Sequence, residues 1–199
     1  MTNYNGTDGN HTPTPESPNS DRQTHTVWVQ WSTMSDEIRP YNPTEDRDAL
    51  WDLNRGFELG LGTGTGDDGK RERYEEKLSE AYRERYLAWV ERCVAEQEYV
   101  VSVAISNEEV VGYAFVLPES LAFIWDAAVL NELYVREEYR GTGIADDLMD
   151  AVLATAAEQD LPLDRLVLDV DRENERARGF YRRYGFEHWG EMVARPLER

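Results

Sequence analysis

The sequence predicts an α/β fold, a single domain in which helices flank a mixed, mostly antiparallel sheet. Residues 100–105 and 110–117 are alternating, β-branched segments, and the short polar turn between them is typical of an antiparallel hairpin. Residues 127–135 are almost continuously apolar, as in a strand at the centre of a sheet. A helical pattern over residues 144–159 separates this strand from another at 166–170. Strands joined by a crossover helix lie parallel, so we expect the sheet to be mixed.

Three elements are expected before the hairpin. Residues 38–40 form a short strand, and an acidic helix-start signature at residues 43–46 opens the first helix. A glycine-rich connection follows. Apolar and aromatic residues then recur at helical spacing, which predicts one long helix over residues 71–96. We interpret its aromatic stripe, which includes Tyr82 and Trp89, as core packing.

Two elements are expected after the parallel pair. Asn174 can cap a helix over residues 175–184, because its side-chain oxygen can accept a hydrogen bond from the first turn. Gly185 ends that helix, since glycine readily adopts the left-handed conformation of a C-terminal cap. Residues 186–193 are expected to form the last strand of the sheet.

Composition excludes several classes of protein. The chain has 199 residues, of which 40 are acidic and 21 basic, and its net charge is −19. A surface this acidic disfavours nucleic acid as a partner, because phosphate binding requires a basic face. No apolar run approaches the roughly 20 residues of a membrane span, and the polar N-terminus lacks a signal segment. We therefore expect neither membrane insertion nor secretion, but a cytoplasmic protein.

The single cysteine limits covalent and metal chemistry. Cys93 excludes an internal disulfide and a multi-cysteine metal site, and no metal centre is predicted. It lies on a face of the long predicted helix. A free cysteine in such a place is usually a packed thiol.

The N-terminal residues differ in composition from the rest of the chain. Residues 1–26 contain almost nothing apolar, so they cannot bury enough surface to offset the entropy of ordering. Residues 27–31 are compatible with a short strand. The run that begins at Met34 resembles a natural chain start, which gives the hypothesis that the tail lies upstream of the true start. We expect a disordered tail over residues 1–33 and one folded domain over residues 34–199.

The most informative run is at residues 133–145, where the central strand meets the following helix. Arg140, Gly141 and Gly143 lead directly into a helix that begins near Ile144. Glycine lets the backbone approach a ligand closely, and the helix start presents unpaired N–H groups and the positive end of the helix dipole. Such an arrangement binds phosphate. The run therefore predicts a phosphate-bearing ligand held mainly by the main chain.

This run resembles a family signature. Arg140-Gly141-Thr142-Gly143-Ile144-Ala145 is similar to the Arg/Gln-x-x-Gly-x-Gly/Ala motif of the GCN5-related N-acetyltransferase (GNAT) superfamily. Residues 171–186 resemble the closing motif of that family, with Asn174, an alanine and a Phe-Tyr pair on the helix, and Gly-Phe at its end. The two motifs follow in the right order on the expected elements. The resemblance covers residues 36–195 and implies a sheet whose parallel pair splays apart after Val135.

The resemblance implies an acetyl-CoA-dependent acyltransferase, with acetyl-CoA as co-substrate. The signature backbone would hold the pyrophosphate, the main chain of the central strand would pair with the pantetheine arm, and Asn174 would hydrogen-bond that arm. The implied cofactor-binding residues are Leu133, Tyr134, Val135, Arg140, Gly141, Thr142, Gly143, Ile144, Ala145 and Asn174. The acceptor would be a primary amine of a small molecule, peptide or protein. Dimers are common among similar proteins, so a homodimer is compatible with the resemblance.

Two residues are candidates for catalysis. An alkyl amine has a pKa near 10.4, so only about one in a thousand molecules is neutral at pH 7 and a base must take its proton. Glu132 is the best candidate base, directly or through water, although some relatives carry the glutamate one position earlier, at Asn131. The resemblance places Tyr181 near the sulfur. Its phenol holds its proton at neutral pH and is the candidate acid.

Two other functions compete with this interpretation. Residues 64–70 match G-x-x-x-x-G-K of a nucleotide hydrolase, but Arg71 stands where a P-loop needs Ser or Thr for magnesium. We interpret this segment as a flexible connection. A non-catalytic regulator that binds acyl-CoA is the second alternative.

One feature departs from the family pattern. Asp146 and Asp147 follow the signature, where relatives often have Ser, Thr, Lys or Arg at the first position. Acids suit a helix N-terminus but would face a diphosphate. Arg136 and Arg140 are the expected counterweights.

The acidic surface gives a testable expectation of halophilic adaptation; an ordinary acidic mesophilic protein is the alternative. Between about 0.1 M and 1 M salt the Debye length falls from about 10 to about 3 Å, which screens the repulsion among the acids. We expect the thermal unfolding midpoint to rise steadily over this range, measured by circular dichroism in KCl. Full stability in dilute buffer would contradict the expectation.

Overall fold

The computed structural model describes residues 36–62, 70–190, 192, 193 and 195, all within one compact unit, Met34–Arg199. The expected tail, the strand considered at residues 27–31, the start at Met34 and most of the P-loop-like segment lie outside the described residues. Among the described residues, no helix is long and apolar enough to cross a membrane.

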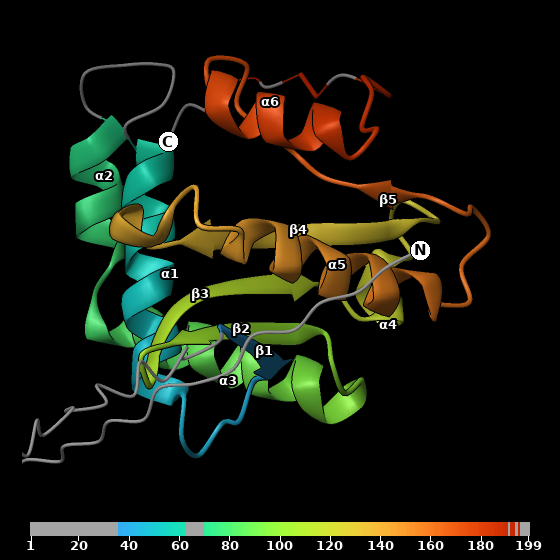
Figure 1. Cartoon of the computed structure of the whole chain (residues 1–199). Helices are drawn as coiled ribbons and strands as arrows, with labels where there is room; N and C mark the ends of the chain where they lie inside the picture. The colour runs from blue at the N-terminus through green and yellow to red at the C-terminus, as the bar shows by residue number, and fades with distance from the viewer. Residues whose placement is uncertain (1–35, 63–69, 191, 194, 196–199) are drawn as a thin grey trace, which may run out of the picture. The chain divides into compact units, whose positions relative to one another are not determined.

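The sheet is mixed, as predicted (Figure 1). Its strands lie in the order of the chain: β1 (Glu37–Pro40), β2 (Val101–Ser106), β3 (Glu109–Val116), β4 (Ala128–Val135) and β5 (Leu166–Val167). The first four are antiparallel, and β5 runs parallel to β4. The β4–β5 pairing is limited to Ala128 with Leu166 and Val129 with Val167. The pairing ends at Val129, so the parallel pair opens, but earlier along β4 than the splay after Val135 that the resemblance implies.

Helices cover both faces of the sheet. They are α1 (Arg47–Gly62), α2 (Lys70–Lys77), α3 (Glu80–Glu96), α4 (Glu119–Ala122), α5 (Ile144–Ala157) and α6 (Glu175–Arg183). α5 packs on one face of β1–β4, and α1 packs on β3 and β4 together with α3 from the other side. Figure 1 shows α6 beside β4, next to the part of that strand that β5 leaves open.

The sheet separates two hydrophobic cores. The first lies between the sheet and α1 and α3, and its large members are Leu50, Leu53, Tyr86, Leu87, Tyr113 and Phe115. Cys93 is buried there, and burial raises the pKa of its thiol to about 11, which confirms the packed thiol. The second core lies under α5 and includes Ile144, Leu148 and Met149. The alternation of strand residues between the faces supplies both cores.

The prediction of one long helix over residues 71–96 is wrong. The chain leaves α2 after Lys77 and starts α3 at Glu80. Ser79 is extended at this break, and its side chain accepts a hydrogen bond from the N–H of Tyr82. Ser79 therefore separates the two helices and caps the second one. The spacing of apolar residues does not reveal such a cap.

The prediction of a last strand over residues 186–193 is also wrong for the described part of that segment, which carries no strand. Gly185 has φ +79°, and the N–H of Phe186 bonds back to the carbonyl of Tyr181. The chain is thus held in a helix cap. Val193 is 94% exposed, so its side chain is not packed as it would be in a strand of the sheet. β5 is likewise shorter than the predicted 166–170, because it has no partner after it leaves β4.

The contact between the sheet and α5 gives a prediction about Gly112. A Cβ there would lie 3.0 Å from the backbone oxygen of Tyr134 and 3.3 Å from Cδ1 of Leu148. Gly112→Ala should lower the free energy of unfolding by about 1–3 kcal/mol, because a strand carbonyl cannot yield. Gly179→Ala is the control: nothing lies within 4 Å of its Cβ, and alanine should raise the stability of α6 by up to about 1 kcal/mol. Equal effects in urea denaturation would contradict the prediction.

Candidate active site

A bulge in β4 decides where the candidate base points. Phe115 pairs with Glu132 and Val116 with Leu130, so Asn131 is an extra residue in β4. An extra residue shifts the alternation of side chains by one. Leu130 consequently belongs to the core under α5, whereas Glu132 faces α1 and α3. Asn131, the position where some relatives have the acid, is exposed.

The carboxylate of Glu132 is almost fully buried, with 7% of the residue exposed. Its Oε2 accepts hydrogen bonds from the hydroxyl of Tyr113 at 2.5 Å, the hydroxyl of Tyr86 at 2.7 Å and Nδ2 of Asn54 at 3.3 Å. Its Oε1 accepts one from Nδ2 of Asn131 at 3.0 Å. A buried carboxylate requires such donors, because removing it from water is otherwise too costly.

Burial raises the pKa of Glu132 above its usual range. The hydrogen bonds from Tyr113 and Tyr86 oppose this shift, since they favour the ionised form, and the negative charge of Glu58 adds to it. The pKa values of both tyrosines are raised well above their usual value, mainly by burial. They therefore stay protonated and donate. The Oδ1 atom of Asn54 is buried beside this group and accepts no hydrogen bond from the described residues.

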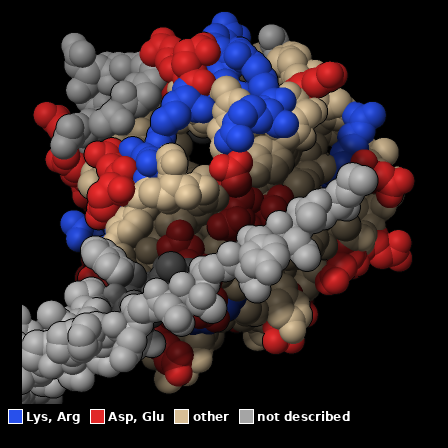
Figure 2. Space-filling view, viewed as in Figure 1, with Lys and Arg blue, Asp and Glu red and all other residues tan. Residues whose placement is uncertain are grey.

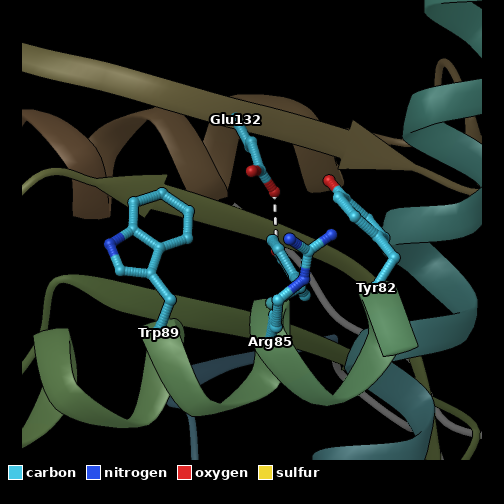
Figure 3. Close-up of a pocket in the computed structure, with 5 residues that line it drawn as sticks. Tyr82, Arg85, Trp89 and Glu132 are labelled. Atoms are coloured by element: carbon cyan, nitrogen blue, oxygen red, sulfur yellow. Dashed lines mark hydrogen bonds between the residues drawn. The ribbon is translucent and has the colours of Figure 1, made fainter. Parts of the chain in front are cut away.

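Glu132 forms the floor of an open pocket of about 270 Å³ (Figure 3). The remaining lining residues come from one face of α3: Tyr82, Arg85, Tyr86 and Trp89. Their spacing of three and four residues places them on successive turns of that helix. The aromatic stripe of α3 therefore lines this pocket as well as packing against the core. Sequence reasoning gave Tyr82 and Trp89 to the core and did not identify Tyr86, Tyr113 or Asn54 as partners of the acid.

The signature loop has the geometry of an anion site. Gly141 has φ +82° and Gly143 φ +106°, conformations that favour glycine. The backbone N–H groups of residues 141–145 make no hydrogen bond with the described part of the chain. They stand at the N-terminus of α5, where the helix dipole favours negative charge. Nothing lies within 4 Å of a Cβ built on either glycine, so the loop is open to a ligand.

Arginines gather beside this loop. Figure 2 shows blue side chains around a hollow in the region where α6 lies in Figure 1. Four of these arginines lie on α6, namely Arg176, Arg178, Arg182 and Arg183, and Arg172 lies three residues before the helix begins. Partial burial and the neighbouring charge of Arg140 lower the pKa of Arg176, so these two cations lie close together. On a chain of net charge −19, this clustering favours a strongly anionic ligand. Sequence reasoning named Arg136 and Arg140 and missed Arg176.

Asp146 does not oppose such a ligand with a free charge. Its carboxylate accepts a hydrogen bond from the hydroxyl of Tyr184 at 2.9 Å and lies 3.1 Å from Nη2 of Arg183. Both partners lie at the C-terminal end of α6, so Asp146 connects that helix to the first turn of α5. Asp146, which departs from the family pattern, is thus paired with residues of this chain.

The other expected ligand-binding residues surround the opening between β4 and β5. Leu133, Tyr134 and Val135 pair with β3 on one side and, within the described chain, with no strand on the other. The guanidinium of Arg140 lies over the ring of Tyr134, and its Nε donates to the carbonyl of Val135 at 3.1 Å. Asn174 caps α6 with Oδ1, which leaves its Nδ2 group available. A free strand edge and an amide donor fit an extended, amide-bearing ligand.

Tyr181 lies on α6, on the other side of β4 from the pocket. Its ring packs against Phe180 and Phe186 at the edge of the core under α5. Burial raises the pKa of its hydroxyl to about 12, although the charge of Arg176 lowers it. No hydrogen bond of this hydroxyl to a described residue is present. The structure brings Tyr181 and Arg176 together, but it does not bring Tyr181 into contact with Glu132.

The family of the chain follows from comparison with known proteins. The model of the acetyltransferase (GNAT) family matches residues 66–186, more than half of the sequence. The chain therefore belongs to the acetyltransferase (GNAT) family, and the resemblance seen in the two motifs is confirmed.

Individual relatives are similar over shorter stretches. An uncharacterized N-acetyltransferase of Mycobacterium tuberculosis is 47% identical over 58 residues, 29% of this chain and 36% of the relative. A protein of Pseudomonas phage PaMx11 named 5-NmdU N-acetyltransferase is 38% identical over 65 residues, 33% of this chain and 43% of the relative. The match thus spans less than half the length of these curated relatives.

Solved structures share the fold. The PaiA N-acetyltransferase of Thermoplasma acidophilum, crystallised in complex with coenzyme A, superposes with a TM-score of 0.62 at 23% identity. The superposition covers 77% of this chain and 91% of that one. The α/β architecture with a splayed sheet is therefore that of the family.

Proposed function

We propose that this protein transfers an acetyl group from acetyl-CoA to a primary amine by direct attack of the amine on the thioester. The observation that carries the proposal is the buried carboxylate of Glu132 on the floor of an aromatic pocket. Membership of the acetyltransferase family supports the same chemistry. Transfer requires a site for a diphosphate, a base for the amine and a donor for the sulfur, and each has a candidate.

The residues around the signature loop fit coenzyme A. Unpaired N–H groups of residues 141–145, with Arg140 and Arg176 beside them, would hold the diphosphate. The open edge of β4 at residues 133–135 would pair with the amide-bearing arm, as an added strand does. The Nδ2 group of Asn174 would donate to the same arm. The bound co-substrate supplies the activated acyl group.

Glu132 would take the proton of the incoming ammonium. An ordinary glutamate, with a pKa near 4.3, is a weak base for a group with a pKa near 10.4. Burial narrows this gap by raising the pKa of Glu132. Tyr86, Tyr113 and Asn54 hold the carboxylate in place. The unsatisfied Oδ1 atom of Asn54 would accept from the amine or from a water that relays the proton.

Tyr181 would donate to the departing sulfur from the opposite side of the β4–β5 opening. Its pKa of about 12 exceeds the roughly 8.5 of a thiol, so complete transfer of its proton is uphill. The larger contribution is therefore a hydrogen bond to the charge that develops on sulfur. Arg176, whose positive charge acts on this phenol, strengthens it as a donor.

The test of the base is Glu132→Gln. In the wild type, kcat/KM should fall at low pH as Glu132 takes up a proton, with a midpoint above about 4.3 because burial raises its pKa. In the variant, kcat/KM should be about 10²–10⁴-fold lower and should no longer fall at low pH (the acidic limb of the profile), with the affinity for CoA unchanged. Initial rates of thiol release from acetyl-CoA, over a broad amine panel and a pH series, measure both.

Glu58→Gln is the matched control for this experiment, because it removes a second buried carboxylate. It should keep the limb and move it to lower pH, since the negative charge of Glu58 raises the pKa of Glu132. A Glu132→Gln enzyme with an unchanged pH profile would contradict the assignment of the base. Binding of CoA without turnover on any amine would indicate a non-catalytic regulator instead.

The test of the donor is Tyr181→Phe. Loss of a hydrogen bond to developing charge should lower kcat about 10- to 100-fold and leave the Kd of CoA nearly unchanged. Tyr184→Phe is the control, since it removes a hydroxyl that bonds to Asp146 from the residue just after the same helix. Steady-state kinetics and calorimetry separate the two effects. Equal losses of kcat in both variants would assign Tyr181 a packing role.

A further inference from the structure

The acceptor pocket contains one charged group that the proposed chemistry does not use. Arg85 lines it together with Tyr82, Trp89 and the acid Glu132. We propose that the acceptor is a small amine that also carries a carboxylate, and that Arg85 binds this carboxylate while the amine lies at Glu132. This inference rests on the proposed function and names the class of its acceptor.

Arg85 is placed to receive a ligand. Figure 3 shows its side chain between those of Tyr82 and Trp89, on the α3 wall of the pocket that faces Glu132. Its Nε donates to the carbonyl of Ala81 at 3.3 Å, which leaves both terminal nitrogens to other partners. Within the described chain, these nitrogens form no ion pair with a carboxylate.

Two neighbouring arginines on the same side of the sheet, Arg83 and Arg47, are paired with acids. Arg83 lies 2.5 Å from Asp48 and 2.9 Å from Glu80, and Arg47 pairs with Glu84 and Glu91. Arg85 faces the pocket but forms no ion pair with an acid of the described chain, although the sequence has 40 acidic residues, so its terminal nitrogens can bind a ligand. A planar guanidinium binds a carboxylate best, through two parallel hydrogen bonds.

The charges around the pocket do not favour an acceptor with a second positive charge. Glu58, whose charge acts on Glu132, already receives Nζ of Lys77 at 2.7 Å and the hydroxyl of Tyr82 at 2.8 Å. The ammonium of Lys77 also lies over the ring of Tyr82, 4.8 Å from its centre. Both donors reach Oε1 of Glu58, and its Oε2 is buried, so a second ammonium would meet the charge of Lys77 at Glu58 or that of Arg85. One ammonium for Glu132 and one anion for Arg85 match the charges of the pocket.

The aromatic side chains strengthen this recognition. Tyr82 and Trp89 lie one turn before and one turn after Arg85 and are both partly buried. Arg85 itself is exposed, so the two rings border the subsite on both sides of the guanidinium and leave it accessible to a ligand from solvent. Their rings also suit the aliphatic part of a small amine that spans the distance between the two charges.

The experiment uses the full chain and matched acceptors. A series of ω-amino acids of increasing length is compared with the corresponding amides and with diamines of equal length. Initial rates at saturating acetyl-CoA give KM and kcat, and calorimetry with the CoA-bound protein gives acceptor binding without turnover. The variants are Arg85→Gln, Arg85→Glu and the control Arg92→Gln, an exposed arginine further along α3.

The wild type should prefer an amino acid over its amide and its diamine. Arg85→Gln should raise KM for the amino acid about tenfold or more, with kcat little changed and with the amides unaffected. Arg85→Glu should reverse the preference toward the diamine, and Arg92→Gln should behave as the wild type. Equal use of acids, amides and diamines, or an equal effect of Arg85→Gln on all three, would overturn the inference.

The two readouts separate this inference from the proposed function. Acetyl transfer without charge preference overturns the role of Arg85 and leaves the function standing. Binding of the amino acid that depends on Arg85, without acetyl transfer to any amine, supports the subsite and contradicts the function. If the protein neither binds the amino acid nor transfers an acetyl group to any amine, both the inference and the proposed function are contradicted.

Discussion

The extra residue at Asn131 is the constraint on which the site depends. By breaking the alternation of β4, it lets Leu130 fill the core under α5 while Glu132 turns toward α1 and α3. A carboxylate buried in this way needs donors, and besides Asn131 of β4 they come from three other elements: Asn54 of α1, Tyr86 of α3 and Tyr113 of β3. The same hydrogen bonds therefore fix the packing of the helices and the position of the acid. Removing a single donor would leave a buried charge underpaired, which costs more than the bond itself contributes.

Charge is distributed unevenly over this acidic chain. Acids dominate its composition, yet arginines collect on and beside α6, next to the amides of the signature loop (Figure 2). An anion near the surface meets general repulsion and a local attraction at one place, which directs it to the loop. At the start of α5, the pairing with Arg183 offsets the charge of Asp146, one of the two acids that would act against this attraction. Composition alone would have argued against a ligand with several phosphates, and the arrangement of the arginines resolves that conflict.

The mixed sheet, with its hairpin and its parallel pair, and the helix α5 could be predicted from the sequence, because the segments at 100–117, 127–135 and 144–159 carry a strong periodic signal. The glycine loop before α5 was also predictable, since Gly141 and Gly143 adopt a backbone conformation that favours glycine. The break at Ser79 and the missing last strand were not, because both depend on local caps that override propensity. The partners of Glu132 lie far away along the chain, at Asn54, Tyr86 and Tyr113. Only the bulge and the packing of two helices reveal that these residues meet.

The tie between Asp146 and Arg183 affects how this region can diverge. Each residue compensates the other: a lone aspartate would repel a phosphate, and a lone arginine would lose its anchor on α5. Selection consequently acts on the pair, and a neutral residue at one position relaxes the requirement at the other. Homologous chains should then show correlated exchange at these two sites, even though one belongs to the phosphate loop's helix and the other to the helix that carries Tyr181. Because this exposed pair joins the two helices, a change at either residue alters the contact between α6 and the first turn of α5.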